Sequence, residues 1–193
     1  MENSEKPRVV LLAGPNGAGK TTAARGFVLD LLGIRNFVNA DTIARGLAAF
    51  DVDSAAFAAG RVMRDRLRHL ASTRADFAFE TNLASRSLAP WLAGLQADGY
   101  RALLAFLWLP SAELAISRVG KRVAQGGHHV PPDIVRRRYD RGLVNLRTTF
   151  LPMVDAVWLF DASRVPARVV ATGQPDELCV HDPEATRRIL RRS

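Results

Sequence analysis

The stretch Gly14-Pro15-Asn16-Gly17-Ala18-Gly19-Lys20-Thr21 decides the fold. Its pattern, G-x-x-x-x-G-K-[ST], surrounds phosphate groups with backbone N–H groups when it lies between a strand and a helix. The apolar run 8–13 before it predicts a short buried strand, and residues 22–32, closed by Gly33, predict a helix. The alternative, a glycine-rich turn that binds nothing, is disfavoured by these flanking elements. The sequence therefore predicts a phosphate-binding loop (P-loop) and a nucleoside triphosphate as its ligand.

Each residue type in the P-loop has a physical reason. Glycines let the backbone approach phosphate closely, and the following helix N-terminus adds positive potential. Lys20 is expected to reach the β- and γ-phosphates, and the Thr21 hydroxyl suits Mg²⁺. We therefore expect ATP and Mg²⁺ as cofactors, with Thr21 as the metal ligand. The residues expected to contact the nucleotide here are Gly14, Asn16, Gly17, Ala18, Gly19, Lys20, Thr21 and Thr22.

Length and composition narrow the class of protein. The chain has 193 residues, of which 48% are hydrophobic, so we expect a single P-loop domain over 1–193. No apolar run approaches the roughly 18 residues of a membrane span. The one cysteine, Cys179, excludes an intramolecular disulfide and fits a reducing compartment. We expect a cytoplasmic protein that does not associate with a membrane.

The formal net charge of +8 comes almost wholly from arginine. The planar arginine side chain suits phosphate, so this charge fits a polyanionic ligand such as ATP. A general bias toward arginine in the composition explains the excess equally well. The net charge alone therefore does not identify a partner.

Short apolar runs alternate with longer amphipathic ones, which is typical of β-α units around a parallel sheet. We expect an α/β protein with the P-loop NTPase fold, in which helices flank a five-stranded, mainly parallel sheet, with a helical lid and a C-terminal edge hairpin. The expected strands are 8–13, 36–39, 77–80, 100–109 and 156–160, with the hairpin at 167–172 and 178–180. The expected helices are 22–32, 42–50, 54–74, 87–97, 111–125, 133–146 and one from Pro183.

Two carboxylates follow predicted strands, Asp41 after 36–39 and Glu80 at the end of 77–80. Ligands of doubly wound sheets gather at the carboxyl ends of the strands, so both should face the P-loop. A phosphotransferase needs one carboxylate to take a proton from an acceptor hydroxyl and another to orient the acceptor or Mg²⁺. The alternative for Asp41 is a helix N-cap before Thr42.

Arginines cluster in the segment of about 118–140. Arg118 and Arg122 are four residues apart on a predicted helix and therefore share a face, where both could contact phosphate. After a Gly-Gly-His-His connector come three consecutive arginines, 136–138, of which at most two can share a face. We expect a helix–loop–helix lid over the phosphates. The alternative is a pair of helices with solvated arginines, and a metal at the two histidines is disfavoured because no other ligand is adjacent.

These motifs together resemble the zeta-toxin-like branch of P-loop kinases. The resemblance covers most of the chain and extends from the P-loop through Asn145 to Asp155 and Asp161. The residues that carry it are Gly14–Thr22, Val38-Asn39-Ala40-Asp41, Phe79-Glu80-Thr81-Asn82-Leu83, Arg118–Val123 with Gly126-Gly127-His128, and Val130-Pro131 leading to Arg136-Arg137-Arg138-Tyr139.

The resemblance implies a kinase that moves the ATP γ-phosphate to a small-molecule hydroxyl, in the best-known members a sugar hydroxyl of UDP-N-acetylglucosamine. It also implies an antitoxin protein as a partner. Asp41 then corresponds to the general base. The implied catalytic residues are Lys20, Asp41, Arg122 and Arg137, the last chosen from the three arginines; the implied substrate-binding residues are Asp41, Glu80, Thr81 and Asn82; and Arg118 is implied to bind the nucleotide.

Two other functions remain open. The spelling Gly-Pro-Asn-Gly-Ala-Gly-Lys-Thr-Thr also looks like the loop of ABC ATPases, although the chain lacks their Ser-Gly-Gly-Gln type of signature. The basic composition would also fit a nucleic-acid-binding protein that uses ATP only structurally. Nucleic acid is the less expected partner, because Phe77 and Phe79 lie in an apolar strand rather than in an RNA-binding motif.

Overall fold

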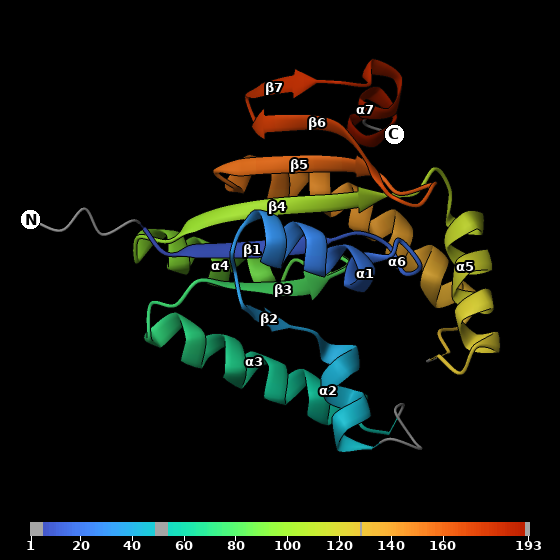
Figure 1. Cartoon of the computed structure of the whole chain (residues 1–193), viewed down its shortest axis with the longest axis horizontal. Helices are drawn as coiled ribbons and strands as arrows, with labels where there is room; N and C mark the ends of the chain where they lie inside the picture. Colours follow the sequence, from blue (N-terminus) through green and yellow to red (C-terminus); the bar gives the residue numbers. More distant parts are fainter. Residues whose placement is uncertain (1–5, 49–53, 128, 192–193) are drawn as a thin grey trace, which may run out of the picture.

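The computed structural model describes residues 6–48, 54–127 and 129–191, which form one seven-stranded sheet in the order β2-β3-β1-β4-β5-β6-β7 (Figure 1). The first five strands of the chain run parallel, and the last two are antiparallel. The strands are β1 (Arg8–Ala13), β2 (Asn36–Val38), β3 (Phe77–Thr81), β4 (Arg101–Trp108), β5 (Ala156–Asp161), β6 (Arg168–Gln174) and β7 (Glu177–Val180). The predicted count of five strands is too low, because the C-terminal hairpin β6–β7 pairs with β5 and extends the same sheet.

The helices lie close to their predicted positions. The predicted helix 22–32 begins two residues earlier, and its second half is a π-helix. The end of the predicted helix 42–50 falls outside the described residues. The helices are α1 (Lys20–Ala24) with the π-helix Arg25–Leu31, α2 (Ala40–Leu47), α3 (Ala56–Ser72), α4 (Leu88–Ala97), α5 (Ala112–Ala124), α6 (Pro132–Asn145) with the π-helix Leu146–Phe150 and the 3-10 turn Leu151–Met153, and α7 (Pro183–Leu190). Across the ranges that the structure describes, no helix has the length and apolar character of a membrane span.

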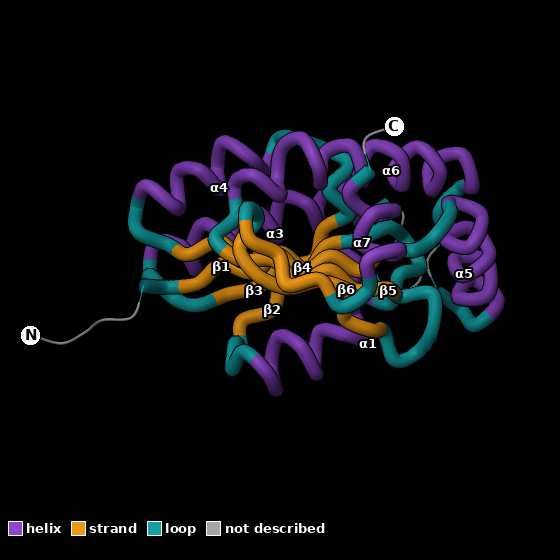
Figure 2. The backbone as a smooth tube through the Cα atoms, turned by 90° about the horizontal axis from the view of Figure 1, so that it is seen from above, coloured by secondary structure: helices purple, strands orange, loops and turns teal. Residues whose placement is uncertain are grey.

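Both faces of the sheet are covered by helices, as the view from above shows (Figure 2). On β1, Val9 and Leu11 point into a core completed by α3, α4 and α7. Their neighbours Val10 and Leu12 point the other way, into a core completed by α1, its π-helical continuation and α5. Because β1 is buried on both faces from Val9 to Ala13, its sequence is apolar at each of these positions rather than at alternate ones.

The strand order brings the functional motifs to one edge. β1 lies between β3 and β4, so the P-loop after β1 is next to the end of β3. The last residue of β1, Ala13, is in register with Thr81 of β3 and with Phe106 of β4. β2 lies on the outer side of β3 and leads directly into α2. The carboxyl ends of three neighbouring strands therefore face a common region.

Removal of a core ring should destabilise the fold far more than removal of a surface ring. Phe79 is 0% exposed in β3, whereas Phe57 is 76% exposed on α3. We expect Phe79→Ala to lower the free energy of unfolding by about 3–5 kcal/mol, through lost burial and the cavity that it leaves. Phe57→Ala should change it by less than about 0.5 kcal/mol. Urea denaturation measures both, and equal losses would contradict the assignment of the core.

Candidate active site

The P-loop is packed so closely that only glycine fits at two of its positions. Gly14, Gly17 and Gly19 all have positive φ, at 145°, 79° and 82°. A Cβ on Gly14 would overlap with the Leu107 carbonyl oxygen, and one on Gly17 would lie 2.9 Å from the Ala115 oxygen. The loop is thus seated between the end of β4 and α5, with its backbone bent in the way that phosphate binding requires.

Lys20 places a buried positive charge inside this loop. Its side chain is 7% exposed, and its Nζ donates hydrogen bonds to the carbonyl oxygens of Gly14 (2.9 Å) and Pro15 (3.0 Å). Nζ also lies 3.5 Å from Oε1 of Glu80. Burial lowers the pKa of Lys20 below its ordinary value, while the carboxylates of Glu80 and Asp41 oppose this shift. These contacts hold Nζ where the phosphates of a nucleotide would need it.

Glu80 connects the lysine to two further side chains. Its Oε2 accepts hydrogen bonds from the Thr21 hydroxyl (2.8 Å) and from Nδ2 of Asn39 (2.6 Å). A hydroxyl beside a carboxylate is the hard oxygen donor set that Mg²⁺ prefers, so these residues fit the predicted metal. Throughout the described chain, no group of three or more His, Cys, Asp and Glu side chains could hold a metal ion. A metal here would need phosphate oxygens or water as additional ligands, which is usual for Mg²⁺.

Asn39 caps α2 and thereby sets the position of Asp41. The Asn39 side chain is 6% exposed, and its Oδ1 accepts a hydrogen bond from the Thr42 amide (2.9 Å). The interpretation of Asp41 as the helix N-cap is therefore wrong, because Asn39 has that role. Asp41 instead lies exposed in the first turn of α2. Asn39 was not predicted as a site residue; an N-cap search would have found it, since Asn is among the preferred capping residues.

The predicted substrate-binding residues come together in a polar pocket of about 220 Å³. Residues at the ends of β2 and β3 form most of its wall, as the strand order requires. The four predicted residues Asp41, Glu80, Thr81 and Asn82 all line it, and Lys20 lies on its boundary with the P-loop. The complete lining of this polar pocket is Asn16, Lys20, Asn39, Ala40, Asp41, Glu80, Thr81, Asn82 and Arg138.

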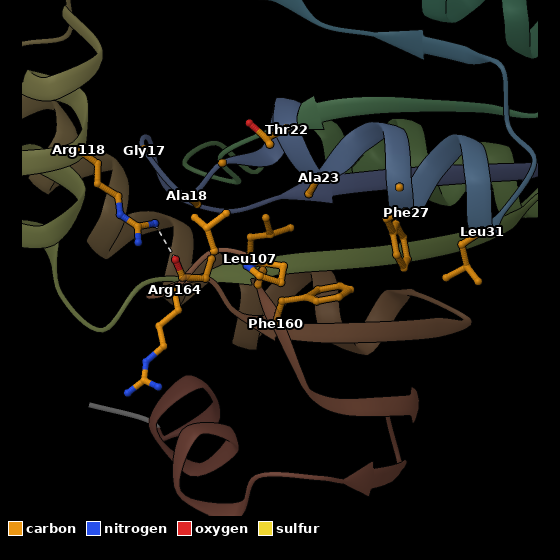
Figure 3. Close-up of a pocket in the computed structure, with 16 residues that line it drawn as sticks. Gly17, Ala18, Thr22, Ala23, Phe27, Leu31, Leu107, Arg118, Phe160 and Arg164 are labelled. Atoms are coloured by element: carbon orange, nitrogen blue, oxygen red, sulfur yellow. Dashed lines mark hydrogen bonds between the residues drawn. The ribbon is translucent and has the colours of Figure 1, made fainter. Parts of the chain in front are cut away.

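A second and larger cavity, an apolar cleft of about 530 Å³, borders other residues of the P-loop (Figure 3). Its P-loop residues include Gly17, Ala18, Gly19 and the predicted Thr22. The rings of Phe27 and Phe160 line it and meet edge to face, with their centroids 5.4 Å apart. Apart from Ala18, none of its aromatic or aliphatic lining was predicted, because these positions have the pattern of ordinary core residues. The rest of the lining is Ala23, Gly26, Leu31, Leu107, Arg118, Ala162, Arg164, Val165, Pro166 and Ala167.

Arg118 and Arg122 have different surroundings, although they share a helix. The Arg118 guanidinium lines the apolar cleft (Figure 3). It donates to the carbonyl oxygens of Ala162 (2.6 Å) and Ser163 (2.7 Å), which ties α5 to the loop after β5. Arg122 lies near enough to Lys20 to contribute to the lowering of its pKa. Of the two arginines, Arg122 is therefore the one with an electrostatic effect on the Lys20 pKa, and Arg118 is the one that anchors α5.

The end of α5 explains the two glycines of the connector. Gly126 has a φ of +82°, and its amide donates a hydrogen bond to the Val123 carbonyl oxygen. The Gly127 amide donates a hydrogen bond to the Arg122 carbonyl oxygen. This pair of bonds is a Schellman motif, which ends a helix at a residue in the left-handed conformation. A Cβ on Gly127 would also lie 2.6 Å from Cγ of Arg122. His128, at the predicted tip of the connector, lies outside the described residues.

The three arginines of α6 point to different surroundings. Arg136 donates to Oε1 of Glu113 at 3.0 Å, so it faces the start of α5. Arg137 is exposed and belongs to the lining of neither cavity. Arg138 lines the polar pocket together with Lys20 and Asp41. Of the three candidates, the structure thus brings Arg138 to the site rather than the predicted Arg137.

Comparison with known proteins agrees with this architecture. Residues 9–145, which include the P-loop, the polar pocket and all of α6, match the family described as AAA domain. The chain belongs to this family. The match supports the predicted nucleotide-binding P-loop. It does not distinguish the zeta-toxin-like branch from other members of the family.

Three solved structures are similar to the whole chain. A chain of the AvrRxo1-ORF1:ORF2 complex with ATP has a TM-score of 0.75 and 18% identity over 99% of this chain, which spans 66% of that chain. A chain of the PezAT toxin–antitoxin system of Streptococcus pneumoniae has a TM-score of 0.67 and 16% identity, covering 100% of this chain and 82% of its own. Shikimate kinase of Bacteroides thetaiotaomicron has a TM-score of 0.51 and 15% identity, and the match covers 96% of this chain and 99% of the shikimate kinase chain. These similarities confirm the predicted P-loop NTPase fold.

Nucleotide binding should depend on the glycine that is packed against α5. In Gly17→Ala, the new Cβ would meet the Ala115 carbonyl and Cβ of Arg118, so the P-loop must shift. We expect the affinity for ATP to fall more than about tenfold, a cost of about 1.4 kcal/mol. The matched control is Gly60→Ala on α3, where a Cβ meets no atom within 4 Å. Calorimetric titration with ATP measures both, and unchanged affinity in Gly17→Ala would contradict this geometry.

Proposed function

We propose that the protein is an ATP-dependent kinase that transfers the γ-phosphate to a hydroxyl group of a small molecule. One observation carries this proposal: the P-loop lies between two cavities of different chemistry. The larger, apolar cleft borders Gly17–Gly19 and Thr22, and the smaller, polar pocket borders Asn16 and Lys20. A protein that only binds or hydrolyses a nucleotide has no use for the second cavity.

The nucleotide would lie along the P-loop with its base in the apolar cleft. The rings of Phe27 and Phe160 offer apolar surface for a base, and the loop amides and Lys20 suit the phosphates. Thr21, with Glu80 next to it, would bind Mg²⁺. When bound, the metal neutralises charge on the phosphate oxygens. Arg122 adds positive potential near Lys20.

The acceptor would lie in the polar pocket with its hydroxyl beside Asp41. Asp41 takes the hydroxyl proton as the oxygen forms a bond to the γ-phosphorus; the bond to the β–γ bridging oxygen breaks, and ADP leaves. Lys20 and Arg138 stabilise the charge of the transferring group from within the same pocket. Glu80, Thr81 and Asn82 would orient the acceptor. Arg138 thus replaces Arg137 in the proposed catalytic set.

The resemblance to zeta-toxin-like kinases and the likeness to the PezAT structure favour a UDP-amino sugar as the first acceptor to test. They also support an antitoxin protein as a partner. The test incubates the protein with ATP, Mg²⁺ and a panel of UDP-sugars, free sugars and nucleosides, and analyses the products by mass spectrometry. We expect one acceptor to gain a phosphoryl group with stoichiometric formation of ADP. ATP binding without any phosphorylated acceptor would refute the proposal, and acceptor-independent hydrolysis would favour an ABC-like ATPase.

Asp41 should be required for transfer but not for nucleotide binding. Asp41→Asn retains the shape of the side chain and removes its ability to take a proton, so we expect turnover to fall by about 10²–10⁴-fold. The affinity for ATP should remain within about twofold, because Asp41 lines the polar pocket and not the apolar cleft proposed for the nucleotide base. Lys20→Ala should lose both. The control is Asp65→Asn, an exposed carboxylate of α3 that pairs with Arg68. Full activity of Asp41→Asn would remove the assignment of the base.

The arginines of α6 offer an internal comparison. Arg138→Ala removes a positive charge from the polar pocket, and we expect kcat to fall by at least about tenfold through lost transition-state stabilisation. Arg137→Ala removes an exposed charge beside it in sequence and should remain within about twofold of the wild type. Steady-state kinetics with saturating ATP distinguishes the two. The reverse ranking would restore Arg137 as the catalytic arginine.

A further inference from the structure

One face of α6 is fitted to the loop that follows β3. Arg138, Gly142 and Asn145 are spaced by four and three residues and therefore lie on the same face of the helix. A Cβ on Gly142 would lie 2.5 Å from the carbonyl oxygen of Asn82. The helix backbone thus contacts a residue that lines the polar pocket, and only glycine permits this approach.

The loop itself has an unusual conformation. Leu83 has φ +56°, in the left-handed region that leucine rarely adopts, and it is 1% exposed. Its amide donates to Oγ1 of Thr81 (3.1 Å), and the Ala84 amide donates to Oδ1 of Asn82 (2.9 Å). The side chains of Thr81 and Asn82 are therefore oriented by the loop's own backbone. Such strain persists only where the surrounding structure over-determines it.

Asn145 supplies that constraint. Its side chain is 7% exposed, and its Nδ2 donates to the Leu83 carbonyl oxygen at 2.7 Å. Its Oδ1 accepts a hydrogen bond from Nε of Arg86 at 2.9 Å. Both the NH₂ group and the oxygen of the Asn145 side chain are therefore hydrogen-bonded to residues of the loop. At the same helix, the Tyr139 hydroxyl donates to the Leu109 carbonyl oxygen at 2.8 Å, so α6 is also attached to the end of β4.

We infer that Gly142 and Asn145 are positioning residues that fix the β3 loop against α6, so that Thr81, Asn82 and Arg138 form a rigid, preformed wall of the acceptor pocket. This inference rests on the proposed function. The C-terminal half of α6 then belongs to the wall of the acceptor pocket and not to a lid that moves.

The test separates acceptor binding from ATP binding. Asn145→Asp retains the side-chain oxygen that accepts the hydrogen bond from Arg86. It replaces the Nδ2 group that donates to the Leu83 carbonyl with a second oxygen, which cannot donate. We expect KM for the acceptor identified in the panel, or for UDP-N-acetylglucosamine, to rise at least about tenfold, a weakening of about 1.4 kcal/mol. The dissociation constant for ATP should remain within about twofold. The control is Val144→Ala, at an exposed position next to Asn145.

A second measurement requires no substrate. Hydrogen exchange of the Leu83 and Ala84 amides should accelerate at least about tenfold in Asn145→Asp and remain unchanged in Val144→Ala. Should Asn145→Asp fail to fold, Arg86→Ala removes the other partner of Asn145 from an exposed position and replaces it in both measurements. An acceptor KM equal to that of the wild type, or a parallel loss of ATP affinity, would overturn the inference. Absence of transfer in the wild type would instead refute the proposed kinase function.

Discussion

The buried charge of Lys20 is the constraint on which the candidate active site depends. An ammonium group taken out of water must be surrounded by acceptors, and here they are the carbonyls of Gly14 and Pro15 with the carboxylate of Glu80. Glu80 in turn accepts from Thr21 and from Asn39, the residue that caps α2. One buried charge therefore orders the P-loop, the end of β3 and the start of α2.

The same arrangement gives the site its two sides. The P-loop separates an apolar cleft from a polar pocket, and Lys20 with Asn16 lies on the polar side. Asp41 and Arg138 line that pocket from α2 and α6, and in the proposed binding mode they would supply a proton acceptor and a positive charge beyond the terminal phosphate. A simple ATPase would not need this second compartment, whereas phosphate transfer to a hydroxyl requires it.

Sequence reasoning succeeded where local chemistry determines structure. The P-loop and the strand-end position of Asp41 and Glu80 follow from short patterns, and the structure shows the predicted strands and helices around them. It failed where packing decides. The joining of β6–β7 to the main sheet depends on pairing with β5, and the left-handed Leu83 depends on Asn145, 62 residues away. Arg138 lies on the same helix face as Gly142 and Asn145, which contact the β3 loop. Arg138 could have been chosen over Arg137 from this spacing only if that contact had been known.

A crystal structure with a non-hydrolysable ATP analogue and Mg²⁺ tests the central claim most directly, because the claim concerns which side of Lys20 each substrate occupies. The account predicts that the base lies against Phe27 and Phe160, that the terminal phosphate contacts Lys20, and that the pocket lined by Asp41, Thr81 and Asn82 stays open for an acceptor. A nucleotide that fills this polar pocket, or whose base lies outside the apolar cleft, would contradict the account.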